Sequence, residues 1–144
     1  MASVFTKIDH VGIAVADLDA AVALYERLTG GSPSHRQEVR SDGIEAVMFE
    51  VGESRIELLG STGPESRIAR FLEKRGPGLH HVAYGVDDVQ ANLDRFAALG
   101  LELIDTCPRR GAGGRLVAFL HPSAAGGVLI ELCQPDGEPA GQHA

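Results

Sequence analysis

The sequence predicts an α+β fold of paired βαβββ modules, whose strands form a curved mixed sheet around a metal site. Three observations predict this fold. The second half of the chain repeats the first, each half alternates strand and helix patterns, and a histidine recurs at the matching place in both halves. Repeated units stack because a single unit cannot bury its apolar face alone.

The repeat is clearest where each half begins. Residues 8–18 read IDHVGIAVADL and residues 79–89 read LHHVAYGVDDV, so His10 corresponds to His81. Strand side chains alternate between two faces. Branched residues such as Val11 therefore face the helices, and each histidine shares the other face with small residues that leave room beside it.

A helical pattern follows each first strand. Apolar residues recur every three or four positions over 20–28 and 91–99, which is typical of an amphipathic helix. Asp17 and Asp88 stand just before these segments, where a carboxylate can cap free amide groups. Glycines follow both segments, as they commonly do at helix ends.

Each half then returns to strand patterns, with a third strand completing the module. The predicted strands are 32–39, 44–51 and 55–59 in the first half, and 102–106, 115–120 and 128–133 in the second. We therefore predict one domain over 1–144. It comprises module one at 5–60, a linker helix within 61–76, module two at 77–135 and a flexible tail at 136–144.

The charge and the cysteines limit the partners and the location. The net charge of −7 argues against nucleic-acid or anionic-membrane partners. The two cysteines show no metal or redox spacing, the first nine residues lack a signal-peptide pattern, and no apolar run reaches membrane-span length. We therefore expect a cytoplasmic protein.

Two histidines and two glutamates recur at symmetric positions. Arg55-Ile56-Glu57-Leu58 matches Leu129-Ile130-Glu131-Leu132, much as His10 matches His81. Pseudo-twofold symmetry would bring the four side chains into one cavity. Two histidines with one or two carboxylates suit Mn, Co, Fe, Ni or Zn and leave coordination positions open for a substrate. His80 faces the other way and is interpreted as structural.

The segments 8–15, 78–83 and 119–132 resemble the vicinal oxygen chelate superfamily, which includes glyoxalase I, extradiol dioxygenases and bleomycin resistance proteins. Within it, the likeness is greatest to methylmalonyl-CoA epimerases and spans about residues 7–134. The resemblance implies the vicinal oxygen chelate fold and a homodimer. It also implies a divalent metal ion, with Co favoured over Mn, Ni, Zn or Mg.

The resemblance further implies a reaction and a set of site residues. The reaction interconverts (R)- and (S)-methylmalonyl-CoA by 1,1-proton transfer through a metal-stabilised enolate. His10, His81 and Glu131 are carried over as metal ligands, and Glu57 takes a fourth position where some members have Gln. The partner is thus a small acyl-CoA, whose anionic tail Arg109, Arg110 or Arg115 could hold.

Proton transfer on both faces of the substrate calls for two acid/base groups. Glu131 is one candidate, as a ligand that could also move a proton, and Glu45 is the second. Glu45 lies within one residue of where the resembling epimerases carry a catalytic glutamate. Alternation places Glu45 with Val47 and Phe49, which would raise its pKa if the face is apolar. The alternative is an ordinary glutamate in water at the end of a strand.

Two other functions fit the same scaffold. A glyoxalase I-like lyase would also use a metal and a glutamate base. A small-molecule-binding resistance protein would lack the acid/base pair and would have a cavity richer in aromatic side chains. The chain has two Tyr, five Phe and no Trp, which counts against the binding protein.

Overall fold

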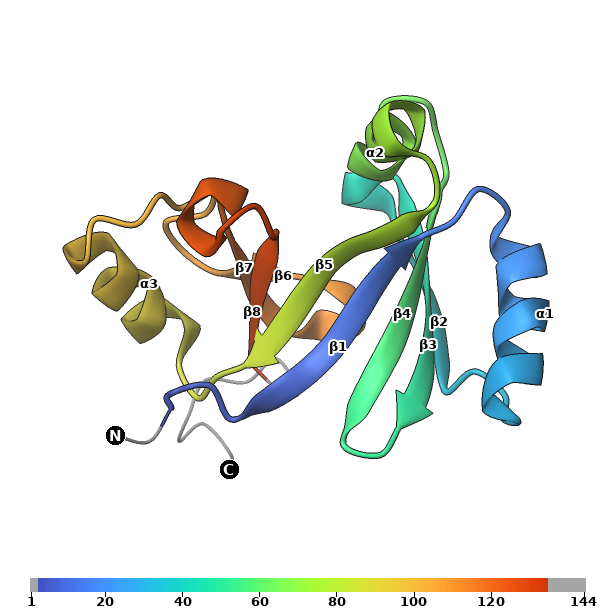
Figure 1. The fold of residues 1–144 in the computed structure, drawn as a ribbon, viewed down its shortest axis with the longest axis horizontal. Helices are drawn as coiled ribbons and strands as arrows, with labels where there is room; N and C mark the ends of the chain where they lie inside the picture. Colours follow the sequence, from blue (N-terminus) through green and yellow to red (C-terminus); the bar gives the residue numbers. More distant parts are fainter. Residues whose placement is uncertain (1–2, 135–144) are drawn as a thin grey trace. The chain divides into compact units, whose positions relative to one another are not determined.

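The structure is a computed structural model that describes residues 3–134 (Figure 1). The chain forms two compact units. His10–His80 makes up one unit, and the segment that ends at Asp9 joins the chain from His81 onward in the other. The predicted tail at 136–144 lies outside the described residues.

The first unit contains the predicted βαβββ order followed by the linker helix. Its sheet has the strand order β2-β3-β4-β1, in which β1 and β4 are parallel and the other neighbours are antiparallel. The elements are β1 (Lys7–Ala14, which begins in the other unit), α1 (Leu18–Thr29), β2 (His35–Val39), the 3₁₀ helix η1 (Arg40–Asp42), β3 (Ile44–Val51), β4 (Ser54–Ser61) and α2 (Arg67–Arg75).

The second unit repeats this arrangement. Its strand order is β5-β8-β7-β6, and again the first strand is parallel to the last, β5 to β8. The repeat and the mixed sheets predicted from the sequence are therefore confirmed. The elements are β5 (Gly78–Gly85, which begins in the first unit), α3 (Val89–Ala98), β6 (Arg109–Arg110), η2 (Ala112–Gly114), β7 (Leu116–Leu120), η3 (Pro122–Ala125) and β8 (Ile130–Gln134).

The helices begin where the capping residues predict. The Asp17 carboxylate accepts a hydrogen bond from Ala20 N at 3.1 Å, and the Asp88 carboxylate accepts one from Ala91 N at 3.0 Å. Such a bond satisfies one of the amide groups that the first helical turn leaves without a backbone acceptor. The equivalent caps confirm the repeat at the level of single hydrogen bonds.

The predicted strand at 102–106 is wrong. Leu103 makes only an isolated bridge to Leu120, and the edge strand is the shorter β6 at Arg109–Arg110. Ile104 N and Asp105 N both donate to the carbonyl of Phe119, and the Asp105 carboxylate accepts from Phe119 N at 2.8 Å. The Asp105 side chain thus accepts a hydrogen bond that a backbone carbonyl would accept in a regular β-ladder, and strand pairing stops there. In the first half the predicted strand at 32–39 begins only at His35.

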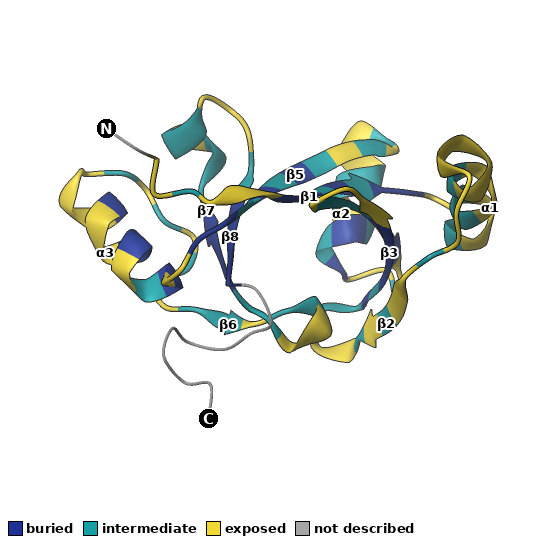
Figure 2. Cartoon of the chain, turned by 90° about the horizontal axis from the view of Figure 1, so that it is seen from below, coloured by how far each residue is buried: buried dark blue, intermediate teal, exposed yellow. Residues whose placement is uncertain are grey.

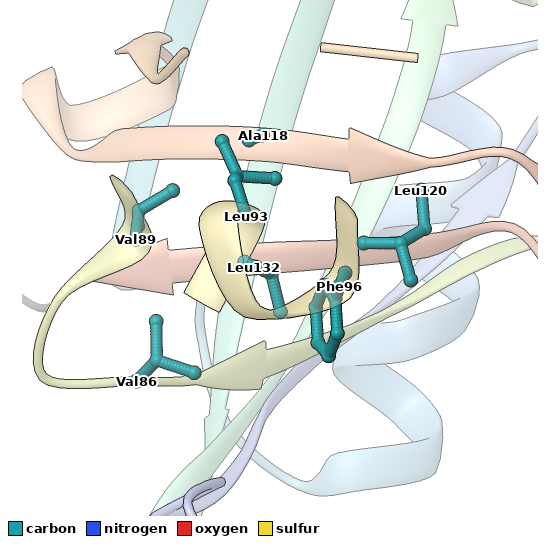
Figure 3. Close-up of a cluster of buried hydrophobic side chains, with 7 residues drawn as sticks. All are labelled: Val86, Val89, Leu93, Phe96, Ala118, Leu120 and Leu132. Atoms are coloured by element: carbon teal, nitrogen blue, oxygen red, sulfur yellow. The ribbon is translucent and has the colours of Figure 1, made fainter. Parts of the chain in front are cut away.

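An apolar cluster lies between α3 and the sheet of the second unit (Figure 3). One face of α3 is buried while the opposite face is exposed, as Figure 2 shows. The cluster packs α3 and the residue after β5 against β7 and β8. Its members are Val86, Val89, Leu93, Phe96, Ala118, Leu120 and Leu132.

Replacing Leu93 with alanine should lower the free energy of unfolding by about 2–5 kcal/mol, because Leu93 is fully buried and the change leaves a cavity. Chemical denaturation monitored by circular dichroism measures the loss. Leu99→Ala is the matched control, since Leu99 is 64% exposed and should change stability little. Equal losses in the two variants would contradict this description of the core.

Within the second unit, the segment before β1 packs against the end of β5. The ring of Phe5 stacks on Tyr84 at 4.6 Å between ring centroids, and Thr6 N donates to the carbonyl of Gly85 at 2.8 Å. A Cβ atom on Gly85 would lie 2.9 Å from Thr6 Oγ1, closer than side chains normally approach. Gly85 therefore allows the chain to pass closely here.

Candidate metal centre

The first unit contains a buried histidine–glutamate pair. His10 Nε2, from β1, lies 3.4 Å from Glu57 Oε1, from β4. In the parallel ladder Gly12 is the partner of Glu57, so the residue directly beside Glu57 has no side chain. The Glu57 side chain can therefore extend along β1 toward His10. The pair lies on the small-residue face that the sequence predicts for the histidine.

The second unit contains the equivalent pair. His81 Nε2, from β5, lies 2.9 Å from Glu131 Oε1, from β8. Ala83, again a small residue two positions after the histidine, is the ladder partner of the glutamate. The two units thus build the same local arrangement from the same ladder offset. The two pairs are equivalent, because in each one the glutamate is the ladder partner of the small residue two positions after the histidine.

Both pairs have the chemistry of metal ligands. All four side chains are buried, and burying ionisable groups is costly unless they are paired or hold a metal ion. Two donor atoms bound about 2.1 Å from one metal ion at a right angle are about 3.0 Å apart. The observed separations of 2.9 and 3.4 Å are close to this spacing. The donor sets therefore fit a divalent ion of intermediate softness.

An aromatic side chain that the sequence reasoning did not single out lies beside the second pair. The Phe119 ring meets the ring of His81 edge to face, with centroids 5.8 Å apart, and Phe119 is the ladder partner of Glu131. The Arg109 guanidinium lies 5.4 Å above the same ring and 3.6 Å from Asp105. Pairing the two predicted strands in register would have placed Phe119 beside Glu131, and this is the signal in the sequence that could have identified Phe119.

The other arginines suggested for an anionic substrate are placed differently. Arg110 Nη1 donates to the carbonyl of Gly114 at 2.6 Å within the glycine-rich turn. Arg115 Nη1 donates to the Asp9 carboxylate at 2.9 Å and is partly buried. The Arg115 guanidinium is thus engaged with a buried carboxylate, whereas the more exposed Arg109 lies beside Asp105. Binding of phosphate by any of the three arginines stays a prediction.

Two further histidines have roles of their own. His80 packs against Phe71 of α2, with ring centroids 4.9 Å apart, in agreement with the structural interpretation. The His121 Nδ1 atom accepts a hydrogen bond from Ser123 N at 3.1 Å and so caps η3.

Glu45 lies among polar partners. Arg36 Nε donates to its carboxylate at 2.7 Å and Arg36 Nη2 donates to Asp19 of α1 at 2.9 Å. The hydrogen bond to Glu45, and to a smaller extent the one to Asp19, raises the pKa of the Arg36 guanidinium, which stays charged. The side chain of Glu45 is 33% exposed, so its surroundings are partly solvated and polar as well as apolar.

The ladder also gives the direction of Glu45. Met48 is the partner of Glu57, so these two side chains share a face of the sheet. Glu45 lies three residues before Met48 and projects from the opposite face. No contact of Glu45 tests its role as an acid/base, which stays a prediction, but its direction argues against that role.

We expect that Glu45→Gln will reduce hydrogen exchange at C2 of the substrate by less than about tenfold, short of the 10²–10⁴-fold that a general acid–base residue typically contributes. The carboxylate faces α1 and Arg36, away from the face of Glu57. Proton NMR of the substrate in D2O measures the rate. Arg36→Gln is the control for loss of the ion pair alone. A loss of 100-fold or more in Glu45→Gln with normal exchange in Arg36→Gln would identify Glu45 as an acid/base after all.

Comparison with known proteins gives a consistent family. The Glyoxalase/Bleomycin resistance protein/Dioxygenase superfamily matches residues 9–119. The chain is 38% identical over 130 residues to an ethylmalonyl-CoA/methylmalonyl-CoA epimerase of Cereibacter sphaeroides, covering 89% of this chain and 97% of the relative.

Solved structures agree with this comparison. Methylmalonyl-CoA epimerase from Mycobacterium tuberculosis superposes with a TM-score of 0.88 at 39% identity, over 94% of this chain and 91% of that one. A methylmalonyl-CoA epimerase in complex with methylmalonyl-CoA and NH4+ superposes with a TM-score of 0.87 at 34% identity, over 97% and 99%. The chain therefore belongs to the Glyoxalase/Bleomycin resistance protein/Dioxygenase superfamily, and within it resembles the methylmalonyl-CoA epimerases.

Proposed function

We propose that this protein is a metal-dependent epimerase that interconverts (R)- and (S)-methylmalonyl-CoA by 1,1-proton transfer. The observation that carries the proposal is the pair of equivalent, buried His–Glu arrangements, one in each unit. These occur in a chain whose relatives include methylmalonyl-CoA epimerases, one of them in complex with methylmalonyl-CoA.

His10, His81 and Glu131 are the proposed ligands of one divalent ion, with Glu57 at a fourth position. The family resemblance favours Co, with Mn, Ni, Zn and Mg as the other candidates. When bound, the ion supplies Lewis-acid stabilisation of the negative charge that develops on the thioester and carboxylate oxygens of the substrate. Burial of the four side chains supports a low-dielectric surrounding, in which such stabilisation is stronger than in water.

Glu131 is the proposed acid/base that the described contacts support best. A carboxylate that binds through one oxygen keeps a second oxygen able to accept the proton from C2. Phe119 is its ladder partner and an apolar neighbour of His81, so it would help exclude water there. The second proton would be returned to the opposite face of C2. Glu45, the partner predicted from the sequence, is the weaker assignment because its carboxylate faces α1.

Ethylmalonyl-CoA is a second candidate substrate, because the Cereibacter sphaeroides relative is an ethylmalonyl-CoA/methylmalonyl-CoA epimerase. The two acyl groups differ by one methylene, which a pocket distinguishes by about 1–3 kcal/mol. A homodimer is proposed from the family resemblance, and a cytoplasmic location is proposed from the cysteine spacing and the apolar pattern of the sequence. Among residues 3–134, no helix combines the length and apolar character that crossing a membrane requires.

The test is exchange at C2 in D2O. Purified protein is treated with a chelator, reloaded with Co²⁺ or Mn²⁺, and given methylmalonyl-CoA, ethylmalonyl-CoA or the hemithioacetal of methylglyoxal and glutathione. We expect metal-dependent deuterium incorporation into methylmalonyl-CoA. Turnover of the hemithioacetal alone would establish a glyoxalase I-like lyase instead, and binding of the acyl-CoA without exchange under any metal would establish a binding protein.

A further inference from the structure

Asp9 is a buried acid that the proposed chemistry does not use. Its side chain is 1% exposed, and it immediately precedes the proposed ligand His10 in β1. Acidic side chains are almost never fully buried unless they are paired. The environment of Asp9 therefore requires an explanation.

Asp9 is paired with Arg115, which stands 106 residues later, just before β7. Arg115 Nη1 donates to Asp9 Oδ2 at 2.9 Å and lies 3.9 Å from Cys133 Sγ, while Lys7 Nζ lies 3.9 Å from Asp9 Oδ1. The Arg115 side chain is itself only 19% exposed. The backbone around Arg115 is held by a hydrogen bond from Gly111 N to the Arg115 carbonyl at 2.8 Å. The guanidinium is therefore directed inward from a constrained turn.

A buried ion pair of this kind contributes little net stability compared with an apolar pair of similar volume, because two charges must be removed from water. Such pairs are best attested as devices that select one register or orientation. Net stabilisation alone therefore does not explain why Asp9 and Arg115 form an ion pair in this interior position.

Phe5 and Thr6 hold the segment just before β1 against Tyr84 and Gly85, and Asp9 adds a side-chain anchor inside the strand. Ile8 is 49% exposed, and Lys7 is exposed as well, so Asp9 is the buried side chain among these three residues. Consecutive strand residues project from opposite faces, so holding Asp9 on one face directs His10 to the other. Rotating or slipping β1 by one residue would exchange the two side chains.

We propose that Arg115 is a positioning residue for the metal ligand His10, acting through its ion pair with Asp9. The pair holds Asp9 on its face of β1 and thereby sets the side from which His10 presents Nε2. This inference rests on the proposed metal-dependent function, because it assigns the pair a role in ligand placement. It predicts that metal affinity depends on the charged pair itself, and not only on a filled interior.

The test compares metal binding with stability in a set of variants. Arg115→Met removes the guanidinium that donates to the buried Asp9 carboxylate, so it should lose both stability and Co²⁺ affinity. The double variant Asp9→Leu/Arg115→Met restores an apolar interior and should recover the melting temperature. It should still bind Co²⁺ about 10- to 100-fold more weakly, the loss typical of outer-shell partners of metal ligands. Arg115→Lys should recover part of the affinity.

Calorimetric titration with Co²⁺ gives the affinity, and the visible absorption spectrum at saturating Co²⁺ reports the coordination geometry. Arg70→Met is the control, since Arg70 is an exposed arginine of α2 that donates to the Glu65 carbonyl, and this variant should leave the Co²⁺ affinity unchanged. A double variant with wild-type affinity and an unchanged spectrum would overturn the positioning role. Absence of Co²⁺ binding in the wild-type protein would instead overturn the metal site, and this inference with it.

Discussion

Replacing either His10 or His81 with alanine will remove the bound metal ion from the purified protein. Each variant deletes one imidazole from a buried pair and leaves its glutamate without the nearest nitrogen, at 3.4 Å for Glu57 and 2.9 Å for Glu131. Loss of a direct ligand should weaken binding by more than the 10- to 100-fold typical of outer-shell partners. Elemental analysis after gel filtration measures retention, and titration with Co²⁺ measures affinity.

Because one ion is proposed to use both pairs, the two single variants should be affected alike, and metal-dependent exchange should disappear in both. His35→Ala is the matched control, because His35 is an exposed histidine of β2 that contacts Gln37. Full metal retention in both His10→Ala and His81→Ala would place the ion elsewhere. Retention in one variant only would show that a single pair, and not both, holds the metal.

The two glutamates should separate coordination from proton transfer. Glu131→Gln keeps a carbonyl oxygen that can bind metal but removes the group proposed to accept the proton, so exchange should fall by about 10²–10⁴-fold. Glu57→Gln should reduce exchange by less than about tenfold, because some family members carry Gln at this position. A reduction of that size is smaller than the loss expected when a general acid or base is removed. The rate of deuterium incorporation at saturating substrate and metal distinguishes the two.

These variants are controls for each other, since both replace the glutamate of a buried His–Glu pair with the same amide. Metal content should be measured in parallel, so that a loss of metal is not mistaken for a loss of acid/base function. If Glu57→Gln loses exchange while it retains its metal, Glu57 is the proton-transfer group. If both variants retain exchange, neither glutamate carries the proton.

Local signals made much of the fold predictable. Asp17 and Asp88 identified the helix starts because capping depends only on residues three positions apart. Ile44–Val51 was predicted with its observed bounds because its turn and apolar run are both local. His10 and His81 could be singled out because the repeat compares each with an equivalent in the other half.

Contacts between distant segments were not predictable in the same way. An acid in a strand is usually exposed, and nothing near Asp9 indicates that Arg115, 106 residues away, will bury it. The strand predicted at 102–106 failed because the Asp105 side chain accepts the hydrogen bond of Phe119 N. Glu45 was correctly placed on the face of Val47 and Phe49, but Arg36, on a neighbouring strand, made that surrounding polar.

The place of the first residues affects how the chain matures. Phe5, Thr6 and Asp9 are contacted by Tyr84, Gly85 and Arg115, which leave the ribosome much later. Phe5, Thr6 and Asp9 therefore lack these contacts while the first unit is being synthesised. Joining segments so far apart in sequence is entropically expensive and slow. The β1 strand, which also presents His10, is thus completed only after Arg115 has been synthesised. A chain stopped after the first unit would have one histidine–glutamate pair but an unfinished strand.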